Sequence, residues 1–79
     1  MSHVIAAELV ANVATVVVHQ GDTVGPEDTL VILESMKMEI PVLAEVYGVV
    51  AELAVVEGEV IREGDIIAVI DDMAQLGVT

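Results

Sequence analysis

The stretch Leu30-Val31-Ile32-Leu33-Glu34 recurs in similar form as Ile67-Ala68-Val69-Ile70-Asp71, 37 residues further along the chain. At that offset, residues 7–34 lie over residues 44–71 without a gap. The identical pairs are Ala7/Ala44, Glu8/Glu45, Val13/Val50, Ala14/Ala51, Val18/Val55, Gly21/Gly58 and Asp28/Asp65. Two copies are too few for a solenoid. The repeat therefore predicts two interlocked halves related by a pseudo-twofold axis.

Each half has the composition of β structure. The chain contains seventeen valines and seven isoleucines. Such β-branched side chains fit a pleated surface and lose side-chain freedom in a helix. Turn signals such as Gly21-Asp22, Gly58-Glu59 and Gly64-Asp65 separate short apolar runs, and no window shows a capped helical stripe. We predict strands at 3–8, 12–18, 23–24, 29–34, 39–44, 48–55, 60–61 and 66–70, with a tight hairpin at 35–38.

The length of 79 residues indicates one small domain over 1–79. We expect its ordered core at about 3–71, because the stretch after the second repeat has no counterpart in the first, and a loose tail at 72–79. The chain has no cysteine, which excludes disulfides and thiolate metal sites.

The net charge is −12, from fourteen acidic residues against Lys37 and Arg62. This balance excludes ordinary nucleic-acid binding, which needs basic residues facing phosphates, and argues against anionic lipid surfaces. The acids also keep an apolar chain soluble, so composition alone does not separate solubility from a partner-facing acidic patch. The longest uncharged stretch, Leu9 to Gly21, is shorter than the ~20 apolar residues of a membrane span. The first residues lack a signal-peptide pattern. We therefore expect no membrane association and a cytoplasmic protein.

Lys37 is the sole lysine, and Met36 and Met38 flank it in the stretch Glu34-Ser35-Met36-Lys37-Met38-Glu39-Ile40-Pro41. A tight turn would project this amine furthest from the domain, with rigid strands beneath it. Pro41 lacks an N–H, so we expect it at an edge or bulge. The plainer interpretation is an exposed turn lysine beside methionines that fill the core.

The Met-Lys-Met core with a small residue before it resembles the attachment motif of the biotin carboxyl carrier (biotinyl/lipoyl attachment) domain family. The similarity extends over residues 4–71, including Gly21, Gly58, Gly64-Asp65 and Gly48-Val49-Val50. Two departures are Ser35, where alanine is usual, and Glu8-Leu9-Val10-Ala11, where the family commonly has Pro-Met-x-Gly. No insertion separates Val13 from Lys37, so the protruding thumb of some carriers is absent, as in small free-standing biotinylated proteins.

The resemblance implies an all-β fold, a flattened antiparallel barrel or sandwich of two four-stranded sheets with pseudo-twofold symmetry. It implies biotin attached covalently to Lys37 and recognition of Met36 and Met38 by a biotin protein ligase. The biotinylated lysine would shuttle a carboxyl group between biotin carboxylase and carboxyltransferase sites. Two alternatives remain open. Lipoyl domains share the fold, although their lysine usually follows an acid as Asp-Lys-Ala, and an acidic β module could bind a partner with Lys37 unmodified.

Other side chains give weaker signals. We expect His3 and His19 to be surface residues rather than metal ligands. Glu57, Glu59, Glu63 and Asp65 lack the full spacing of a calcium loop and indicate solvated turns. The sequence contains no catalytic triad, phosphate-binding loop or metal motif, so we expect no catalytic residue, no metal site and no enzymatic activity of its own.

Overall fold

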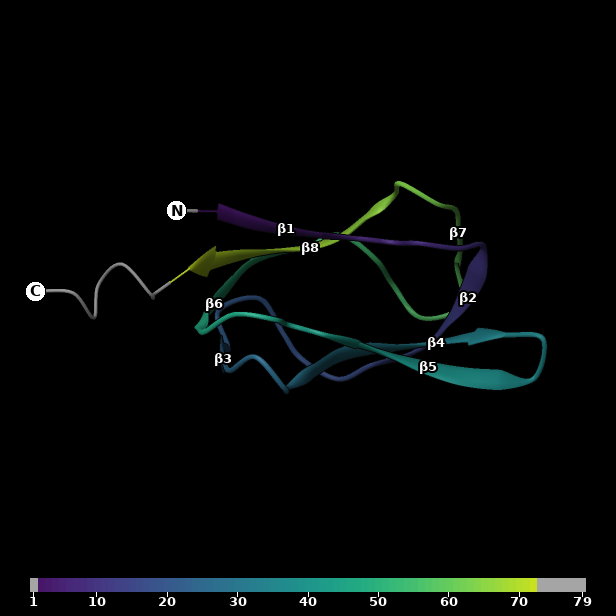
Figure 1. The fold of residues 1–79 in the computed structure, drawn as a ribbon, viewed down its shortest axis with the longest axis horizontal. Helices are drawn as coiled ribbons and strands as arrows, with labels where there is room; N and C mark the ends of the chain where they lie inside the picture. The colour runs from purple at the N-terminus through teal and green to yellow at the C-terminus, as the bar shows by residue number, and fades with distance from the viewer. Residues whose placement is uncertain (1, 73–79) are drawn as a thin grey trace, which may run out of the picture.

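The computed structural model describes residues 2–72, which form eight strands in two antiparallel sheets (Figure 1). The strands are β1 (Ser2–Ala6), β2 (Ala11–Val16), β3 (Thr23–Val24), β4 (Thr29–Ser35), β5 (Met38–Leu43), β6 (Gly48–Leu53), β7 (Val60–Ile61) and β8 (Ile66–Asp72). One sheet has the order β1-β8-β6-β3 and the other β5-β4-β2-β7. The predicted all-β fold of two four-stranded sheets is confirmed. Within the described residues there is no helix that could cross a membrane.

All eight predicted strands are present, but three of them end two residues earlier than predicted. β1, β2 and β6 end at Ala6, Val16 and Leu53, not at residues 8, 18 and 55. In β1 the ladder shifts register between Ile5 and Ala6. After β2 and β6 one more N–H group, that of Val17 or Ala54, bonds to the neighbouring strand, and the chain then turns away. Those turns are held by carboxylates that accept backbone N–H groups, so the backbone is satisfied without strand pairing.

The other strand bounds differ from the prediction by one residue at most, except that of β8. β8 reaches Asp72, two residues beyond the predicted end and within the predicted tail; the other tail residues, 73–79, lie outside the described part of the chain.

The predicted pseudo-twofold relationship is visible in the sheets. Shifting the residue numbers by 37 converts the order β5-β4-β2-β7 into β1-β8-β6-β3. The bulge in β2 between Val13 and Thr15 has its counterpart in β6 between Val50 and Glu52. The turn hydrogen bonds repeat in pairs: Gly21 N to Val50 O with Gly58 N to Val13 O, His19 N to Asp22 Oδ2 with Val56 N to Glu59 Oε1, and Gly25 N to Asp28 Oδ2 with Arg62 N to Asp65 Oδ2.

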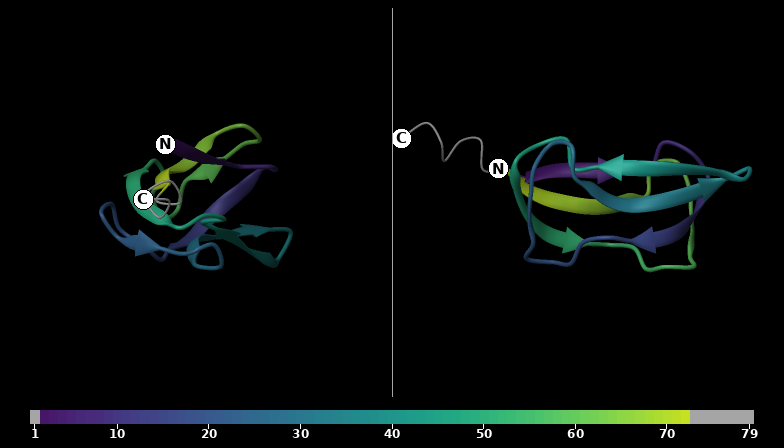
Figure 2. Two further views of the ribbon diagram at one scale, coloured as in Figure 1. Left: turned by 60° about the vertical axis from the view of Figure 1, so that its left-hand side comes forward. Right: turned by 90° about the horizontal axis from the view of Figure 1, so that it is seen from below.

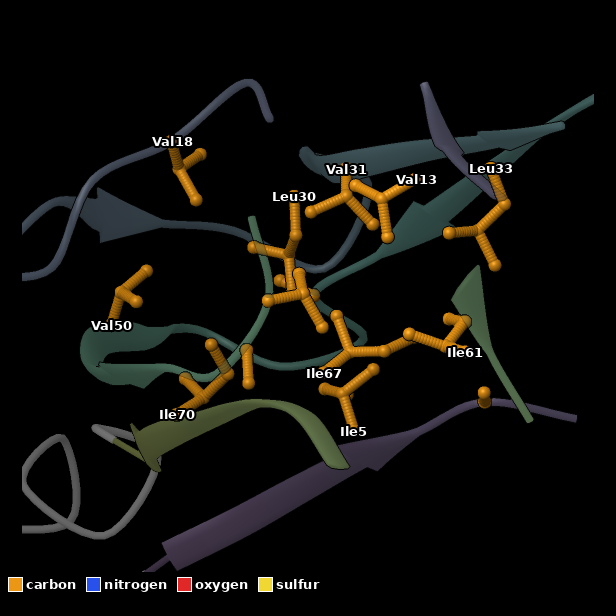
Figure 3. Packing of buried hydrophobic residues seen from close by; sticks show 14 of the residues in the cluster. Ile5, Val13, Val18, Leu30, Val31, Leu33, Val50, Ile61, Ile67 and Ile70 are labelled. Carbon is orange, nitrogen blue, oxygen red and sulfur yellow. The ribbon is translucent and has the colours of Figure 1, made fainter. Parts of the chain in front are cut away.

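The core lies between the sheets and is wholly aliphatic (Figure 3). Val13, Leu30 and Leu33 point inward from one sheet, and Ile67 and Ile70 from the other, each at most 1% exposed. Burying a side chain of this size contributes roughly 1.5–3 kcal/mol. No polar or charged residue is buried among residues 2–72. This core gives the β4–β5 hairpin a rigid base, and the hairpin extends beyond the other strands at one end of the molecule (Figure 2).

Candidate functional site: the lysine hairpin

The turn between β4 and β5 is as tight as an antiparallel pair allows. Ser35 pairs with Met38, which leaves only Met36 and Lys37 in the loop. Below them Leu33 pairs with Ile40, and Leu33 is buried in the core. The hairpin predicted at 35–38 is therefore confirmed, and its ladder links the turn directly to the core.

Met36 and Lys37 both adopt the left-handed conformation, with φ of 53° and 67°. Positive φ at both central residues is the signature of a type I′ turn, whose twist matches that of the flanking strands. Asparagine and glycine usually occupy these positions, because a side chain with a β-carbon is strained there. The strain is of order 1–3 kcal/mol for each such residue and persists only where the surroundings fix it. Neither methionine nor lysine usually adopts this conformation, so it could not be predicted from the residue types at these two positions.

The side chains of the turn are displayed to solvent. Met36 is 90% exposed and Met38 60%, and Lys37 is also exposed. The interpretation in which the methionines fill the core is therefore wrong. Within residues 2–72 no carboxylate forms an ion pair with the Lys37 ammonium. The three predicted site residues thus form one projecting tip, with the amine between two apolar side chains.

Two carboxylates stand just below the tip. Glu34 and Glu39 are directly opposite each other across the β4–β5 ladder, and both are exposed. Like charges in this arrangement destabilise a strand pair. The hairpin therefore carries a local negative charge at its neck that the fold itself does not require.

Pro41 lies in β5, the outer strand of its sheet, as predicted for a residue without an N–H. The remaining candidates do not join the tip. His3 Nε2 lies 2.9 Å from Glu45 Oε1, and His19 Nδ1 lies 3.8 Å from Asp22 Oδ2. His19 is exposed, whereas His3 is only partly so.

Three acidic residues of the second repeat accept backbone hydrogen bonds, two within its own turns and one, Glu57, from the end of β2 in the first repeat. Carboxylates of Glu57, Glu59 and Asp65 accept the backbone N–H groups of Val16, Val56 and Arg62, respectively, at 2.8–2.9 Å. Glu63 is exposed. No group of three His, Cys, Asp or Glu residues in the described part of the chain could hold a metal ion. These contacts agree with the interpretation of the acids as solvated turn residues.

Comparison with known proteins identifies a matching family model and several relatives of this chain. The family model described as biotin-requiring enzyme, of the biotin/lipoyl type, matches residues 3–70. A biotinylated protein TB7.3 homolog of Mycolicibacterium smegmatis is 62% identical over 71 residues, which are 90% of this chain and 100% of that protein. Its namesake in Mycobacterium leprae is 57% identical over 70 residues, 89% of this chain and 99% of that one. The crystal structure of Kluyveromyces lactis urea carboxylase is similar with a TM-score of 0.82 and 30% identity, over 89% of this chain and 6% of that one.

Proposed function

Because the chain belongs to the biotin/lipoyl family of biotin-requiring proteins, we propose that it is a carrier that bears biotin covalently on Lys37. One observation supports the position above all others: the sole lysine of the chain lies at the tip of a projecting hairpin, between exposed Met36 and Met38. Two relatives that this chain matches over 99–100% of their length are named biotinylated proteins.

The residues of the hairpin have different roles in the attachment of biotin. A biotin protein ligase would activate the carboxyl group of biotin and take one proton from the Lys37 ammonium. The neutral Nζ would then attack the carbonyl carbon, so that the C–N bond forms as the activating group leaves from that carbon and the second N–H proton is lost to a base. Lys37 is exposed in a two-residue turn, so that the ligase reaches it without unfolding the strands. Met36 and Met38 present two apolar contacts on either side of the amine for the ligase to recognise.

Once attached, biotin supplies the chemistry of accepting a carboxyl group at one active site and yielding it at another. The protein itself positions this group and catalyses nothing. A rigid core, a projecting tip and a long lysine side chain let one arm reach a biotin carboxylase and then a carboxyltransferase. Tethering raises the local concentration of the group into the millimolar range. The structural similarity to urea carboxylase supports partners of the carboxylase class. We place the protein in the cytoplasm, where such enzymes and their ligase would meet it.

The attachment is tested by co-expression with a biotin protein ligase, followed by intact-mass spectrometry and a streptavidin blot. We expect one biotin per chain and none in Lys37→Arg, which keeps the charge but lacks the nucleophilic amine. Because Lys37 is the only lysine, a signal that persists in this variant would contradict the assignment. A lipoyl adduct formed in the native host would support the lipoyl alternative, and an unmodified mass there would support the acidic interaction module.

A further inference from the structure

A depression lies beside the Lys37 turn, where β4 ends and β2 begins. It is lined by Val10–Asn12 at the start of β2, by Glu34–Lys37 of the hairpin and by Val60 of β7. Asn12 pairs with Glu34 on one side and with Val60 on the other, so these exposed side chains form one row across β4, β2 and β7. The amine that is proposed to carry biotin thus lies on the rim of a surface built from three strands.

The lining combines apolar and polar groups. Val10 and Val60 are 59% and 60% exposed, which leaves two branched aliphatic side chains open to solvent. The other lining residues include the polar residues Asn12, Glu34 and Ser35; Asn12 and Glu34 are exposed, and Ser35 is half-buried. The bicyclic ring of biotin has matching chemistry, with an apolar thioether ring and a ureido group that offers two N–H donors and a carbonyl acceptor. Glu34 and Ser35 are acceptors for the N–H groups, and the Asn12 amide is a donor for the carbonyl.

The pseudo-twofold repeat shows that the fold does not demand these residues. The positions equivalent to Val60, Asn12 and Val10 in the other half are Thr23, Val49 and Tyr47. The same strand geometry therefore forms with different side chains at the end of the molecule without the lysine turn. Val10, Asn12 and Val60 beside Lys37 therefore differ in chemistry from their counterparts in the other half.

We propose that biotin attached to Lys37 folds back into this depression and rests there between visits to partner enzymes. The inference depends on the proposed function, since it needs biotin on Lys37. A tether gives an effective concentration in the millimolar range, so a site of millimolar intrinsic affinity is occupied about half the time. Such a site shields the apolar ring from water and releases it without a large barrier. Such weak, reversible binding is compatible with repeated visits of the biotin arm to partner enzymes.

The test is nuclear magnetic resonance of the full chain with and without biotin. We expect nuclear Overhauser effects between the bicyclic ring protons and the methyl groups of Val10 and Val60. Chemical-shift changes on biotinylation should also spread from the turn to Asn12 and Val60. In the Val10→Ser/Val60→Ser double variant the remote shift changes should vanish. Its biotin should also associate with avidin up to about twofold faster, because the free fraction of the arm rises from about half to nearly all.

The matched control is Val4→Ser/Val17→Ser, which removes two exposed valines that do not line the depression. It should leave both readouts as in the wild type. Intact mass is read first: absence of a biotin adduct contradicts the proposed function, and with it this inference. Full biotinylation with shift changes confined to residues 35–38, and no Overhauser effect at Val10 or Val60, contradicts the resting site alone. If those spectra are found and the Val10→Ser/Val60→Ser variant is also biotinylated more slowly than the wild type, the depression is a contact surface for the ligase instead. The wild-type Overhauser effects decide the question even if the double variant fails to fold.

Discussion

Gly48 lies directly against the backbone of Asp71, so that a β-carbon at Gly48 would overlap the Asp71 carbonyl oxygen and approach Ile70 Cγ2 to 2.7 Å. Gly48 is the first residue of β6, and Asp71, in the neighbouring strand β8, pairs with Val49 of β6. The close approach brings the β6–β8 pair together at the end of the molecule opposite the lysine turn (Figure 1).

We expect Gly48→Ala to destabilise the protein by about 1–3 kcal/mol, because the overlap is with backbone atoms, which cannot rotate away. Chemical denaturation measures the change. Gly25→Ala is the control, since a β-carbon there would meet side-chain atoms alone: Cε1 of exposed Tyr47 at 3.3 Å and, at an ordinary contact distance of 3.8 Å, Asp28 Oδ2. That ring can move, so a similar loss in Gly25→Ala would refute the explanation by backbone overlap.

The left-handed turn predicts a conflict between stability and attachment. Met36→Asn should raise the free energy of unfolding by up to about 1 kcal/mol, because asparagine tolerates positive φ better than methionine. The same change should slow biotin transfer, because it removes one of the two apolar contacts beside Lys37. Denaturation and a timed ligase assay measure the two effects.

Met38→Asn provides the comparison for the turn variant. Met38 is the first residue of β5 and is not among the residues with positive φ. We expect asparagine there to give no gain in stability and a small loss of strand preference. Equal stabilisation by both substitutions would show that the turn conformation of Met36 is not the cause.

The methionines should also decide which ligase acts on the protein. In Met36→Asp/Met38→Ala the turn has the Asp-Lys-Ala pattern typical of lipoyl domains. Biotinylation should fall at least about tenfold if the two contacts together contribute about 1.4 kcal/mol to recognition. Parallel assays with a biotin ligase and a lipoyl ligase would measure the change of preference. Undiminished biotin incorporation would place recognition outside the tip.

The negative charge of the hairpin neck should speed the encounter with basic surfaces around partner active sites. The rate of carboxylation of the biotinylated protein by a biotin carboxylase should fall with rising salt, since the Debye length shortens from about 10 Å at 0.1 M to 3 Å at 1 M. In Glu34→Gln/Glu39→Gln this salt dependence should weaken.

Glu27→Gln/Glu52→Gln is the matched control for charge. It removes the same two charges from exposed positions outside the hairpin. If both double variants lose the salt dependence equally, net charge rather than the placement of Glu34 and Glu39 is responsible. A rate that does not vary with salt in the wild type would remove the steering role of the acids altogether.

Most of the fold could be predicted from the sequence because its signals are local and occur twice. Residues 30–34 and 67–71 are short aliphatic runs between turn signals, and they form β4 and β8. The position of Lys37 at a tip followed from the same spacing. The predicted ends of β2 and β6 were two residues too late, because Val17 and Ala54 have strand-like neighbours in the sequence. Both residues also still donate a hydrogen bond to the neighbouring strand. The chain turns away from the ladder where the carboxylates of Asp22 and Glu59 accept backbone N–H groups.

Two features of the site could not be read from the sequence. The left-handed backbone at Met36 and Lys37 is imposed by the two-residue connection of a twisted ladder, whereas local preference points elsewhere. The row of Glu34, Asn12 and Val60 joins residues far apart in the chain, so it requires the register of three strands.

The exchange of short strands between the halves has a consequence for how the protein unfolds. β7 belongs to the second repeat but completes the sheet of β2, β4 and β5, while β3 of the first repeat completes the other sheet. Neither repeat can therefore form its sheet alone, and loss of one half removes an edge and part of the core from the other. We therefore expect residues 2–72 to fold as one cooperative unit, and contacts between residues distant in sequence should make that folding slow for the size of the domain. Because β4 and β5 beneath the lysine tip belong to this unit, we expect the support of the arm to be lost only when both sheets unfold together.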